Sequence, residues 1–87
     1  MREILVTRQF ERDIKKIPPK IRAQADPVIA LLSKNPMDRR LESYRLRKIS
    51  HPAYRVRIGP YRLIYSFSAT TIVLHRFSHR QDVYKGF

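Results

Sequence analysis

The sequence contains no cysteine, so it forms no disulfide and offers no thiolate as a metal ligand or a nucleophile. Long apolar runs are also missing, because the longest stretches, such as Val28–Leu32, are far too short to span a bilayer. The first residues lack the apolar segment of a signal peptide. We therefore expect a soluble protein of the cytoplasm, with no membrane among its partners and no metal site.

Acidic side chains are scarce. Seven Asp and Glu stand against nineteen Lys and Arg, which gives a net charge of +12 on 87 residues. Residues 43–87 carry nine basic side chains and one acidic side chain, Asp82. Solubility needs only a modest net charge, and arginine, which dominates there, suits bidentate contact with phosphate. Since no basic amphipathic helix stands out, we expect nucleic acid rather than a membrane as the anionic partner.

Two stretches of the first half have the apolar spacing of amphipathic helices. Thr7 fits the N-cap of the first helix, whose apolar stripe is Phe10, Ile14 and Ile17. The second helix contains Pro27, which either kinks it or restarts it with a new cap. A proline turn joins the two helices into an α-helical hairpin.

The remaining chain has the alternating pattern of strands. Branched apolar residues predict an N-terminal strand, and period-two alternation predicts four later strands; the five ranges are 2–7, 44–49, 54–58, 61–67 and 71–77. The length allows a single domain, 1–87. The order βααββββ predicts an α+β fold, in which an N-terminal strand and an α-helical hairpin precede a four-stranded antiparallel sheet with the helices on one face.

The predicted hairpin around Gly59-Pro60 carries the main candidate site. If these two residues form the turn, Arg57 pairs with Arg62, and one face of the hairpin is apolar. The other face holds Arg55, Arg57 and Arg62 beside Ile64. Two arginines directly opposite each other repel, so a scaffold without a use for positive charge would gain from a glutamate there. Three converging arginines therefore favour a phosphate site over a merely solubilising surface.

The segment after the last predicted strand adds His79, Arg80 and Tyr84. The sequence has no carboxylate pair for hydrolysis, no glycine-rich phosphate loop and no serine in a nucleophile-elbow context. RNA supplies its own nucleophile, the 2′-hydroxyl, so its cleavage needs only a base, positive charge and a proton donor, with no cofactor. Because nearby arginines stabilise a phenolate, Tyr84 is a candidate base.

Three segments together resemble the RelE branch of the RelE/ParE toxin superfamily: Phe-Glu-Arg-Asp-Ile-Lys-Lys-Ile (10–17), Tyr-Arg-Val-Arg-Ile-Gly-Pro-Tyr-Arg-Leu-Ile-Tyr (54–65) and His-Arg-Gln-Asp-Val-Tyr (79–84). The likeness covers nearly the whole chain in the same order. It implies the toxin of a type II toxin–antitoxin system, with the compact microbial-ribonuclease fold.

The resemblance also implies an activity and partners. RelE-like toxins are metal-independent mRNA endoribonucleases (mRNA interferases) that act in the ribosomal A site, leave a 2′,3′-cyclic phosphate and a 5′-hydroxyl, and so inhibit translation. The implied partners are a cognate antitoxin in a hetero-oligomer, mRNA on the ribosome, and operator DNA through the antitoxin complex only.

By position, Arg55 and Arg57 lie where RelE has two catalytic lysines, Arg62 on its phosphate-binding arginine, Arg80 on its candidate proton donor and Tyr84 on its candidate base. Arginine does not exchange protons near neutrality as a lysine with a lowered pKa can. We therefore expect the first two arginines to hold RNA and stabilise charge.

The candidate residues fall into two sets. The catalytic set is Arg55, Arg57, Arg62, Arg80 and Tyr84, with His79 as a substitute for proton transfer. The nucleic-acid-binding set is Arg45, Arg47, Lys48, Arg55 and Arg57.

Two other functions stay open. One is a ParE-like inhibitor of DNA gyrase, which is not a nuclease; members of that branch generally lack the catalytic set, so Arg62, Arg80 and Tyr84 together argue against it. The other is a non-catalytic basic module that binds nucleic acid.

Overall fold

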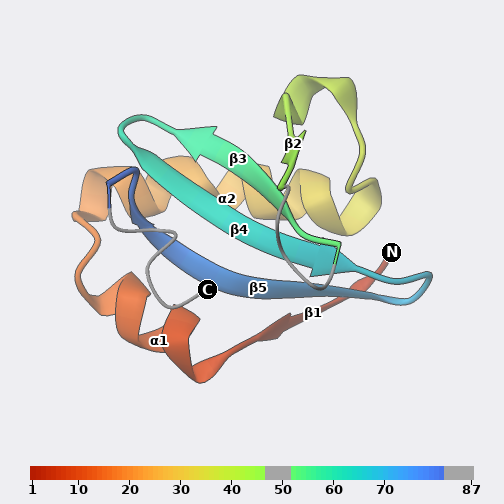
Figure 1. Cartoon of the computed structure of the whole chain (residues 1–87), viewed down its shortest axis with the longest axis horizontal. Helices are drawn as coiled ribbons and strands as arrows, with labels where there is room; N and C mark the ends of the chain where they lie inside the picture. Colours follow the sequence, from red (N-terminus) through yellow and green to blue (C-terminus); the bar gives the residue numbers. More distant parts are fainter. Residues whose placement is uncertain (47–51, 82–87) are drawn as a thin grey trace.

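A computed structural model gives the structure of residues 1–46 and 52–81. In chain order it contains β1 (Glu3–Val6), α1 (Arg8–Lys15), α2 (Pro19–Lys34), the 3-10 helix η1 (Arg39–Leu41), β2 (Tyr44–Arg45), β3 (Tyr54–Ile58), β4 (Tyr61–Phe67) and β5 (Thr71–His79) (Figure 1). The strands form one sheet in the order β1-β5-β4-β3-β2. The predicted α+β class and element order are confirmed.

The sheet is mixed rather than wholly antiparallel. β2, β3, β4 and β5 pair antiparallel with their neighbours, as predicted, whereas β1 runs parallel to β5 and extends the sheet at that edge. The antiparallel prediction counted only connections between consecutive strands, but the helical hairpin carries the chain away from β1, and β1 is then joined by a strand from the far end of the chain. Of the predicted strand 44–49, β2 covers Tyr44–Arg45 and Leu46 is outside any strand, while residues 47–49 lie outside the described residues.

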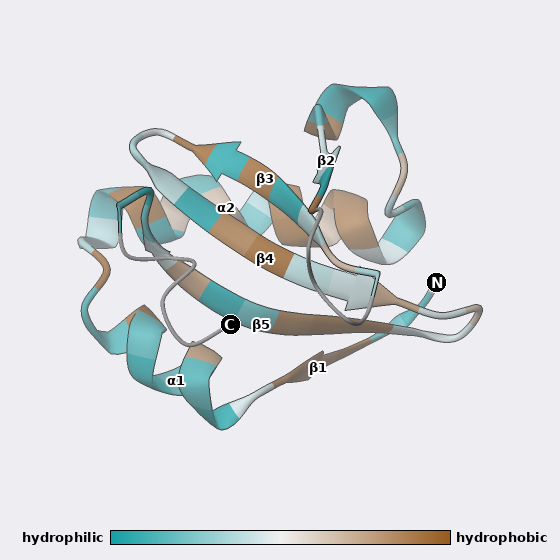
Figure 2. Cartoon of the chain, in the orientation of Figure 1, coloured by the Kyte–Doolittle hydropathy of each residue, from teal (hydrophilic) through white to brown (hydrophobic). Residues whose placement is uncertain are grey.

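Both helices cover one face of the sheet. Thr7 caps α1 as predicted, because its Oγ1 accepts a hydrogen bond from Phe10 N at 3.1 Å. Along β3, hydrophobic and hydrophilic positions alternate (Figure 2), as expected where one face of a sheet is buried, whereas the middle of β4 is hydrophobic at two successive positions, Leu63 and Ile64. The buried core comprises side chains from both helices, the turn between them, η1 and β3–β5: Phe10, Ile17, Ala25, Leu32, Leu41, Val56, Ile58, Leu63, Tyr65, Ile72, Leu74 and Phe77.

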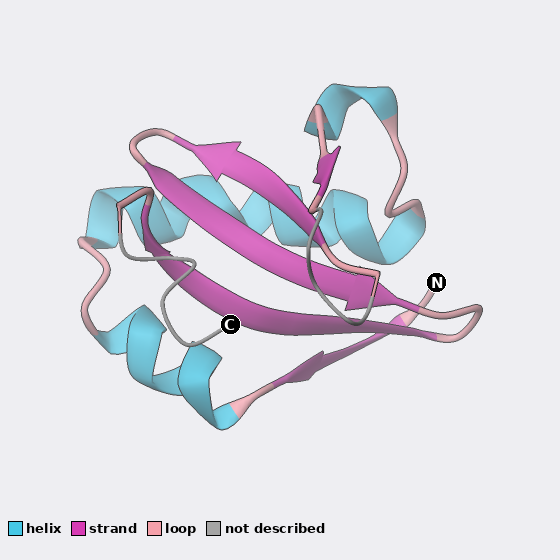
Figure 3. Cartoon of the chain, in the orientation of Figure 1, coloured by secondary structure: helices cyan, strands magenta, loops and turns pink. Residues whose placement is uncertain are grey.

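Pro27 lies inside α2 without ending it. The helix is continuous from Pro19 to Lys34 (Figure 3), so the alternative of a restarted helix is wrong. Pro27 is exposed, while Ala25 and Leu32 on either side of it are buried in the core, and this packing holds the helix together across the missing backbone bond. No helix in 1–46 or 52–81 is long and apolar enough to cross a membrane.

Candidate nucleic-acid interface

The β3–β4 hairpin has the predicted register. Gly59 makes the turn with φ +60°, a value that glycine adopts without strain, and Arg57 lies opposite Arg62. Because side chains alternate across a sheet, Arg55, Arg57 and Arg62 all leave the hairpin on the side away from the helices. We call this side, with these three residues, the arginine face.

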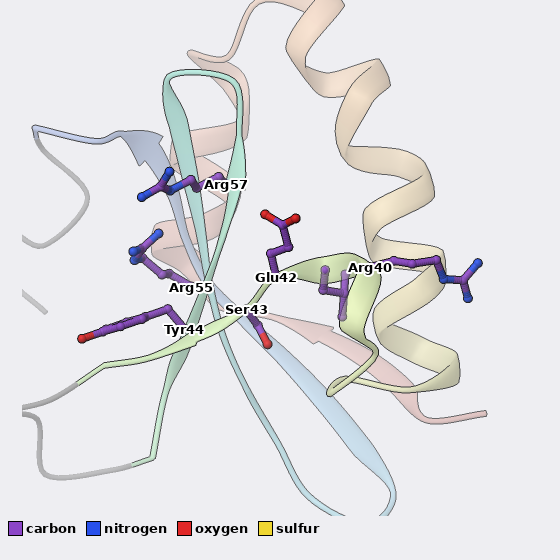
Figure 4. A pocket seen from close by; sticks show the side chains of 7 residues that line it. Arg40, Glu42, Ser43, Tyr44, Arg55 and Arg57 are labelled. Carbon is purple, nitrogen blue, oxygen red and sulfur yellow. The ribbon is translucent and has the colours of Figure 1, made fainter.

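Arg55 and Arg57 project the same way from β3 (Figure 4). Arg57 is exposed, and Arg55 is half-buried with its Cζ 4.8 Å from the ring centroid of Tyr44, a cation–π contact. Neither guanidinium forms an ion pair with any residue of the described part. Within the described residues, neither charge is therefore neutralised by an ion pair, which suits an anionic ligand.

Arg62 is held against the hairpin turn. Its Nη1 donates to Tyr61 O at 3.1 Å and to Gly59 O at 3.4 Å. The guanidinium is thus positioned close to the turn, at the end of the hairpin that Arg57 also occupies.

The start of the C-terminal segment lies beside the same turn. Ser78 of β5 is opposite Arg62, and Arg80 N donates to Pro60 O at 3.0 Å. Arg80 is exposed. The structure therefore brings the backbone of Arg80 beside the hairpin turn that precedes Arg62, while Tyr84 lies outside the described residues.

His79 is on the other side of the sheet. It is opposite Tyr61 in the β4–β5 register, and the two rings meet edge to face with centroids 5.7 Å apart. Its Nδ1 accepts a hydrogen bond from Gln81 N at 3.3 Å. Tyr61 packs against the core under the helices, so the structure does not bring His79 to the arginine face.

The predicted binding residues of the β2 region are divided. Arg45 is exposed, but it lies opposite Tyr54, whose side chain packs on the helix side. Strand alternation therefore directs Arg45 away from the arginine face. Arg47 and Lys48 lie outside the described residues.

A small apolar cluster underlies the arginine face. Ile64 leaves the hairpin on this side, where the sequence placed it beside the arginines on a polar surface, but its exposed fraction is 0%. Ala53 and Leu46 cover it, and Leu46 N donates to Ala53 O at 2.8 Å. Leu46, directly after β2, and Ala53, directly before β3, thus pack over this strand position, which sequence alternation alone does not reveal.

A groove of about 540 Å³ opens between the end of η1 and β3. Figure 4 shows its lining, which consists of Arg40, Leu41, Glu42, Ser43, Tyr44, Arg55 and Arg57. The sequence analysis did not single out Tyr44 or Glu42. A signal for Tyr44 exists, since an antiparallel partner of the predicted strand 54–58 places one residue directly beside Arg55, and Tyr44 occupies that position.

Two titratable groups near this groove have shifted pKa values. The side-chain hydrogen bond from Arg40 holds the pKa of Asp38 at about 2, and Figure 4 shows the Arg40 side chain directed away from Arg55 and Arg57. Burial raises the pKa of Tyr65, whose hydroxyl donates to Pro36 O at 2.7 Å. Tyr65 is therefore a structural hydrogen-bond donor and not a candidate base.

The described part of the arginine face can hold a phosphate, but its arginines do not exchange protons near neutrality. The described imidazole on this side belongs to His75, whose Nε2 is 2.7 Å from Ser66 Oγ. Among residues 1–46 and 52–81 there is no group of three His, Cys, Asp or Glu side chains that could hold a metal. The arrangement therefore suits charge stabilisation by guanidinium groups.

Comparisons with known proteins agree on one family. A family model described as the ParE toxin of the type II toxin–antitoxin system parDE matches residues 4–84. Toxin RelE3 of Methanocaldococcus jannaschii is 29% identical over an alignment of 87 positions that covers 98% of this chain and 98% of that protein. A chain of the RelBE2 toxin–antitoxin complex of Mycobacterium tuberculosis is 32% identical with a TM-score of 0.74, covering 91% of this chain and 98% of that one. A chain of the RelB–RelE antitoxin–toxin complex of Methanococcus jannaschii is 27% identical with a TM-score of 0.77, covering 95% and 98%.

Proposed function

Because the chain belongs to the RelE/ParE superfamily of toxins of type II toxin–antitoxin systems, we propose that it is a ribosome-dependent mRNA endonuclease whose arginine face holds the scissile phosphate. One observation carries this proposal: Arg55, Arg57 and Arg62 share one side of a rigid hairpin, next to the anchored start of the C-terminal segment. A charge cluster of this kind is suited to a phosphate whose negative charge increases during reaction.

The reaction needs no metal. The 2′-oxygen attacks the adjacent phosphorus, the bond from phosphorus to the 5′-oxygen breaks, and the products are a 2′,3′-cyclic phosphate and a 5′-hydroxyl. A base takes the proton of the 2′-hydroxyl, and an acid gives a proton to the leaving 5′-oxygen. The arginines stabilise the additional charge on the five-coordinate phosphorus.

Proton transfer is assigned to the chain end. In this proposal Tyr84 is the base, and proton donation falls to Arg80 or His79. Arg80 lies beside the hairpin turn, but a guanidinium holds its proton tightly near neutrality, whereas the ring of His79 packs against Tyr61 on the helix side. The Tyr84→Phe variant should lose most of its turnover and keep its fold. Circular dichroism of the variant checks the second half of that expectation, since loss of the fold would make Tyr84 a structural residue.

The proposed partner is a cognate antitoxin. Strand β1 forms an edge of the sheet and exposes apolar side chains, with exposed fractions of 37% for Ile4, 44% for Leu5 and 44% for Val6. Such an edge, on a chain with a net charge of +12, suits an amphipathic and partly acidic peptide that folds on binding. Co-expression with the neighbouring reading frame, followed by a pull-down, should recover a stable complex; its absence would count against this partner.

Primer extension on a translated message tests the activity. We expect cuts within codons that appear only when ribosomes translate the message. Naked RNA should stay intact. Cutting of naked RNA at the same positions would contradict the requirement for the ribosome.

Inhibition of DNA gyrase is the second candidate, because the family model that matches residues 4–84 carries the ParE description. This function predicts accumulation of broken DNA in a purified gyrase assay and no cuts in the message. Salt-sensitive RNA binding with neither outcome would instead indicate a non-catalytic binding module.

A further inference from the structure

Tyr44 is a large aromatic side chain that the fold leaves outside the core. Its exposed fraction is 47%, whereas the other described tyrosines, Tyr54, Tyr61 and Tyr65, belong to the core cluster or pack against it. Aromatic rings contribute strongly to binding when a partner covers them. At Tyr44 the fold therefore leaves apolar area that a ligand can cover.

The strand register places Tyr44 on the same side of the sheet as the arginine face. Tyr44 is directly opposite Arg55 in the β2–β3 pair, so the two side chains leave the sheet on one side. Figure 4 shows Tyr44, Arg55 and Arg57 all directed that way. The two arginines are two positions apart along β3, which corresponds to about 6.8 Å at the rise of an antiparallel strand. An aromatic ring and two guanidinium groups thus lie side by side.

The Arg55 guanidinium holds the Tyr44 ring in place. Its Cζ is 4.8 Å from the ring centroid, a cation–π contact. The guanidinium covers one face of the ring, so a flat ligand would stack on the opposite face. Because the contact already restricts the ring, such a ligand loses less free energy in ordering the side chain than it would on a free ring.

A phosphate and a flat aromatic group together describe a nucleotide. Neither Arg55 nor Arg57 forms an ion pair with a described residue, and guanidinium groups suit phosphate. Tyrosine rings are surfaces on which unpaired RNA bases stack, with little dependence on base identity. A peptide rarely offers an anion and a flat ring at every step, whereas each nucleotide of a single strand offers one of each. The site therefore favours single-stranded RNA over a protein partner.

We propose that Tyr44 is a base-stacking residue, which holds an unpaired base of the RNA strand whose phosphates contact Arg55 and Arg57. The inference rests on the proposed function and deepens it, since it places a base beside the phosphate on the arginine face. Tyr44 positions the strand and exchanges no proton with it. The stacked base adds affinity for single-stranded RNA of any sequence, and none for phosphate chains that lack bases.

Fluorescence anisotropy of a short labelled RNA strand, with every 2′-hydroxyl methylated so that it cannot be cut, tests the stacking. Tyr44→Ala should weaken binding of this strand about fivefold to a hundredfold, the loss expected for one stacked base, and Tyr44→Phe should keep the affinity. Calorimetric titration with inorganic polyphosphate, which has the charge and no bases, should give the same affinity for Tyr44→Ala as for the unmodified chain. If the ring only held Arg55 in place, Tyr44→Ala would weaken both ligands equally.

A tryptophan reporter gives a second measurement. The chain contains no tryptophan, so Tyr44→Trp introduces a single one. Its emission should fall when the methylated RNA is added and stay unchanged when polyphosphate is added, because only a stacked base quenches it. Met37→Ala, which removes another exposed apolar side chain with an exposed fraction of 52%, should leave the RNA affinity unchanged.

Unchanged RNA affinity in Tyr44→Ala, an equal loss for polyphosphate, or an equal loss in Met37→Ala would each overturn the inference. Weaker binding of a protein partner by Tyr44→Ala, with unchanged RNA affinity, would overturn it in favour of a protein contact. These measurements need neither ribosomes nor cleavage. Failed stacking with intact mRNA cutting therefore rejects only the inference, and intact stacking without mRNA cutting rejects only the proposed function.

Discussion

Asp13 is a carboxylate held almost wholly inside the protein. Its exposed fraction is 6%, and it accepts hydrogen bonds from Gln9 Nε2 at 2.9 Å, Arg76 Nε at 2.8 Å and Phe77 N at 2.9 Å. The amide of Phe77 lies at an irregularity in β5, where Ile64 is opposite Arg76 and Tyr65 is opposite Leu74. Asp13 thus ties α1 to the strand that leads into the C-terminal segment.

Asp13→Ala should lower the free energy of unfolding by about 3–5 kcal/mol, because it leaves the partly buried guanidinium of Arg76 and the amide of Phe77 without this acceptor. Chemical denaturation measures the change. Glu11→Ala, on the exposed side of the same helix, should change stability by no more than about 0.5 kcal/mol. Similar losses in the two variants would show that the buried network does not hold the helix to the sheet.

Tyr65→Phe tests the buried phenol and its pH dependence. Losing the hydrogen bond to Pro36 O should cost about 1 kcal/mol near neutral pH. Burial raises the pKa of Tyr65 above the ordinary tyrosine value of about 10, so its protonated form is favoured in the folded state. This contribution is complete below the unfolded pKa and is lost as pH rises through the folded pKa. Above pH ~10, the free energy of unfolding should therefore fall less steeply with pH for Tyr65→Phe than for Tyr54→Phe. The second variant keeps Tyr65 and removes a phenol that is only half-buried.

At the scale of elements, the β3–β4 hairpin was predictable from local signals. Gly59 supplies the positive φ, and period-two alternation fixes which side chains share a face, so the register follows once the turn is located. The parallel pairing of β1 was not predictable in the same way, because it joins Glu3–Val6 to residues nearly seventy positions later. Nothing local to either segment records that contact.

Some of these structural features could have been predicted from the sequence alone, and others could not. Asp13 lies three residues after Phe10 and four before Ile17, so helical spacing alone places it on the apolar stripe and marks it as unusual. The burial of Ile64, in contrast, depends on Leu46 and Ala53 folding over it from another strand's connection. The turn that strains Glu42 likewise has no sequence signature, since glutamate is rare in that conformation.

Gly59→Ala tests the hairpin turn. An added Cβ would lie 3.6 Å from Ile21 Cδ1, an ordinary contact, so crowding is not the expected cost. The expected cost is the positive φ, which alanine adopts only with strain, and the free energy of unfolding should fall by about 1 kcal/mol. Thermal unfolding checks the value, with Ala69→Gly at an exposed position of the β4–β5 turn as a comparison. An unchanged midpoint for Gly59→Ala would mean that the turn relaxes to another conformation.

At the scale of the molecule, the net charge indicates the kind of partner, and the fold indicates which side of the sheet that partner contacts. The composition indicates a polyanionic partner, and the family match confirms the resemblance to RelE/ParE toxins over residues 4–84. Charge alone did not locate the interface, because basic residues occur on both sides of the sheet. The register of the strands selects Arg55, Arg57 and Arg62 and sends Arg45 to the other side.

Because only some basic residues lie on the arginine face, we expect the salt dependence of RNA binding to change when one of these is removed and not when another is. The slope of log affinity against log salt for single-stranded RNA should fall by about 0.7 when Arg55→Gln removes one phosphate contact. Arg22→Gln, on the exposed surface of α2, should leave the slope unchanged. Fluorescence anisotropy of a labelled oligonucleotide at several salt concentrations gives both slopes. Equal slopes for the two variants would mean that RNA is bound by the charge of the whole surface.

The most direct test of the arginine face is the rate of mRNA cutting in a purified translation system by Arg57→Gln. This guanidinium is exposed and forms no ion pair with a described residue, so its loss should leave the melting temperature unchanged. The cutting rate should fall roughly 100-fold, whereas Arg22→Gln should cut at the unmodified rate. Equal rates for both variants, or a fall in rate that merely follows a fall in melting temperature, would contradict the account.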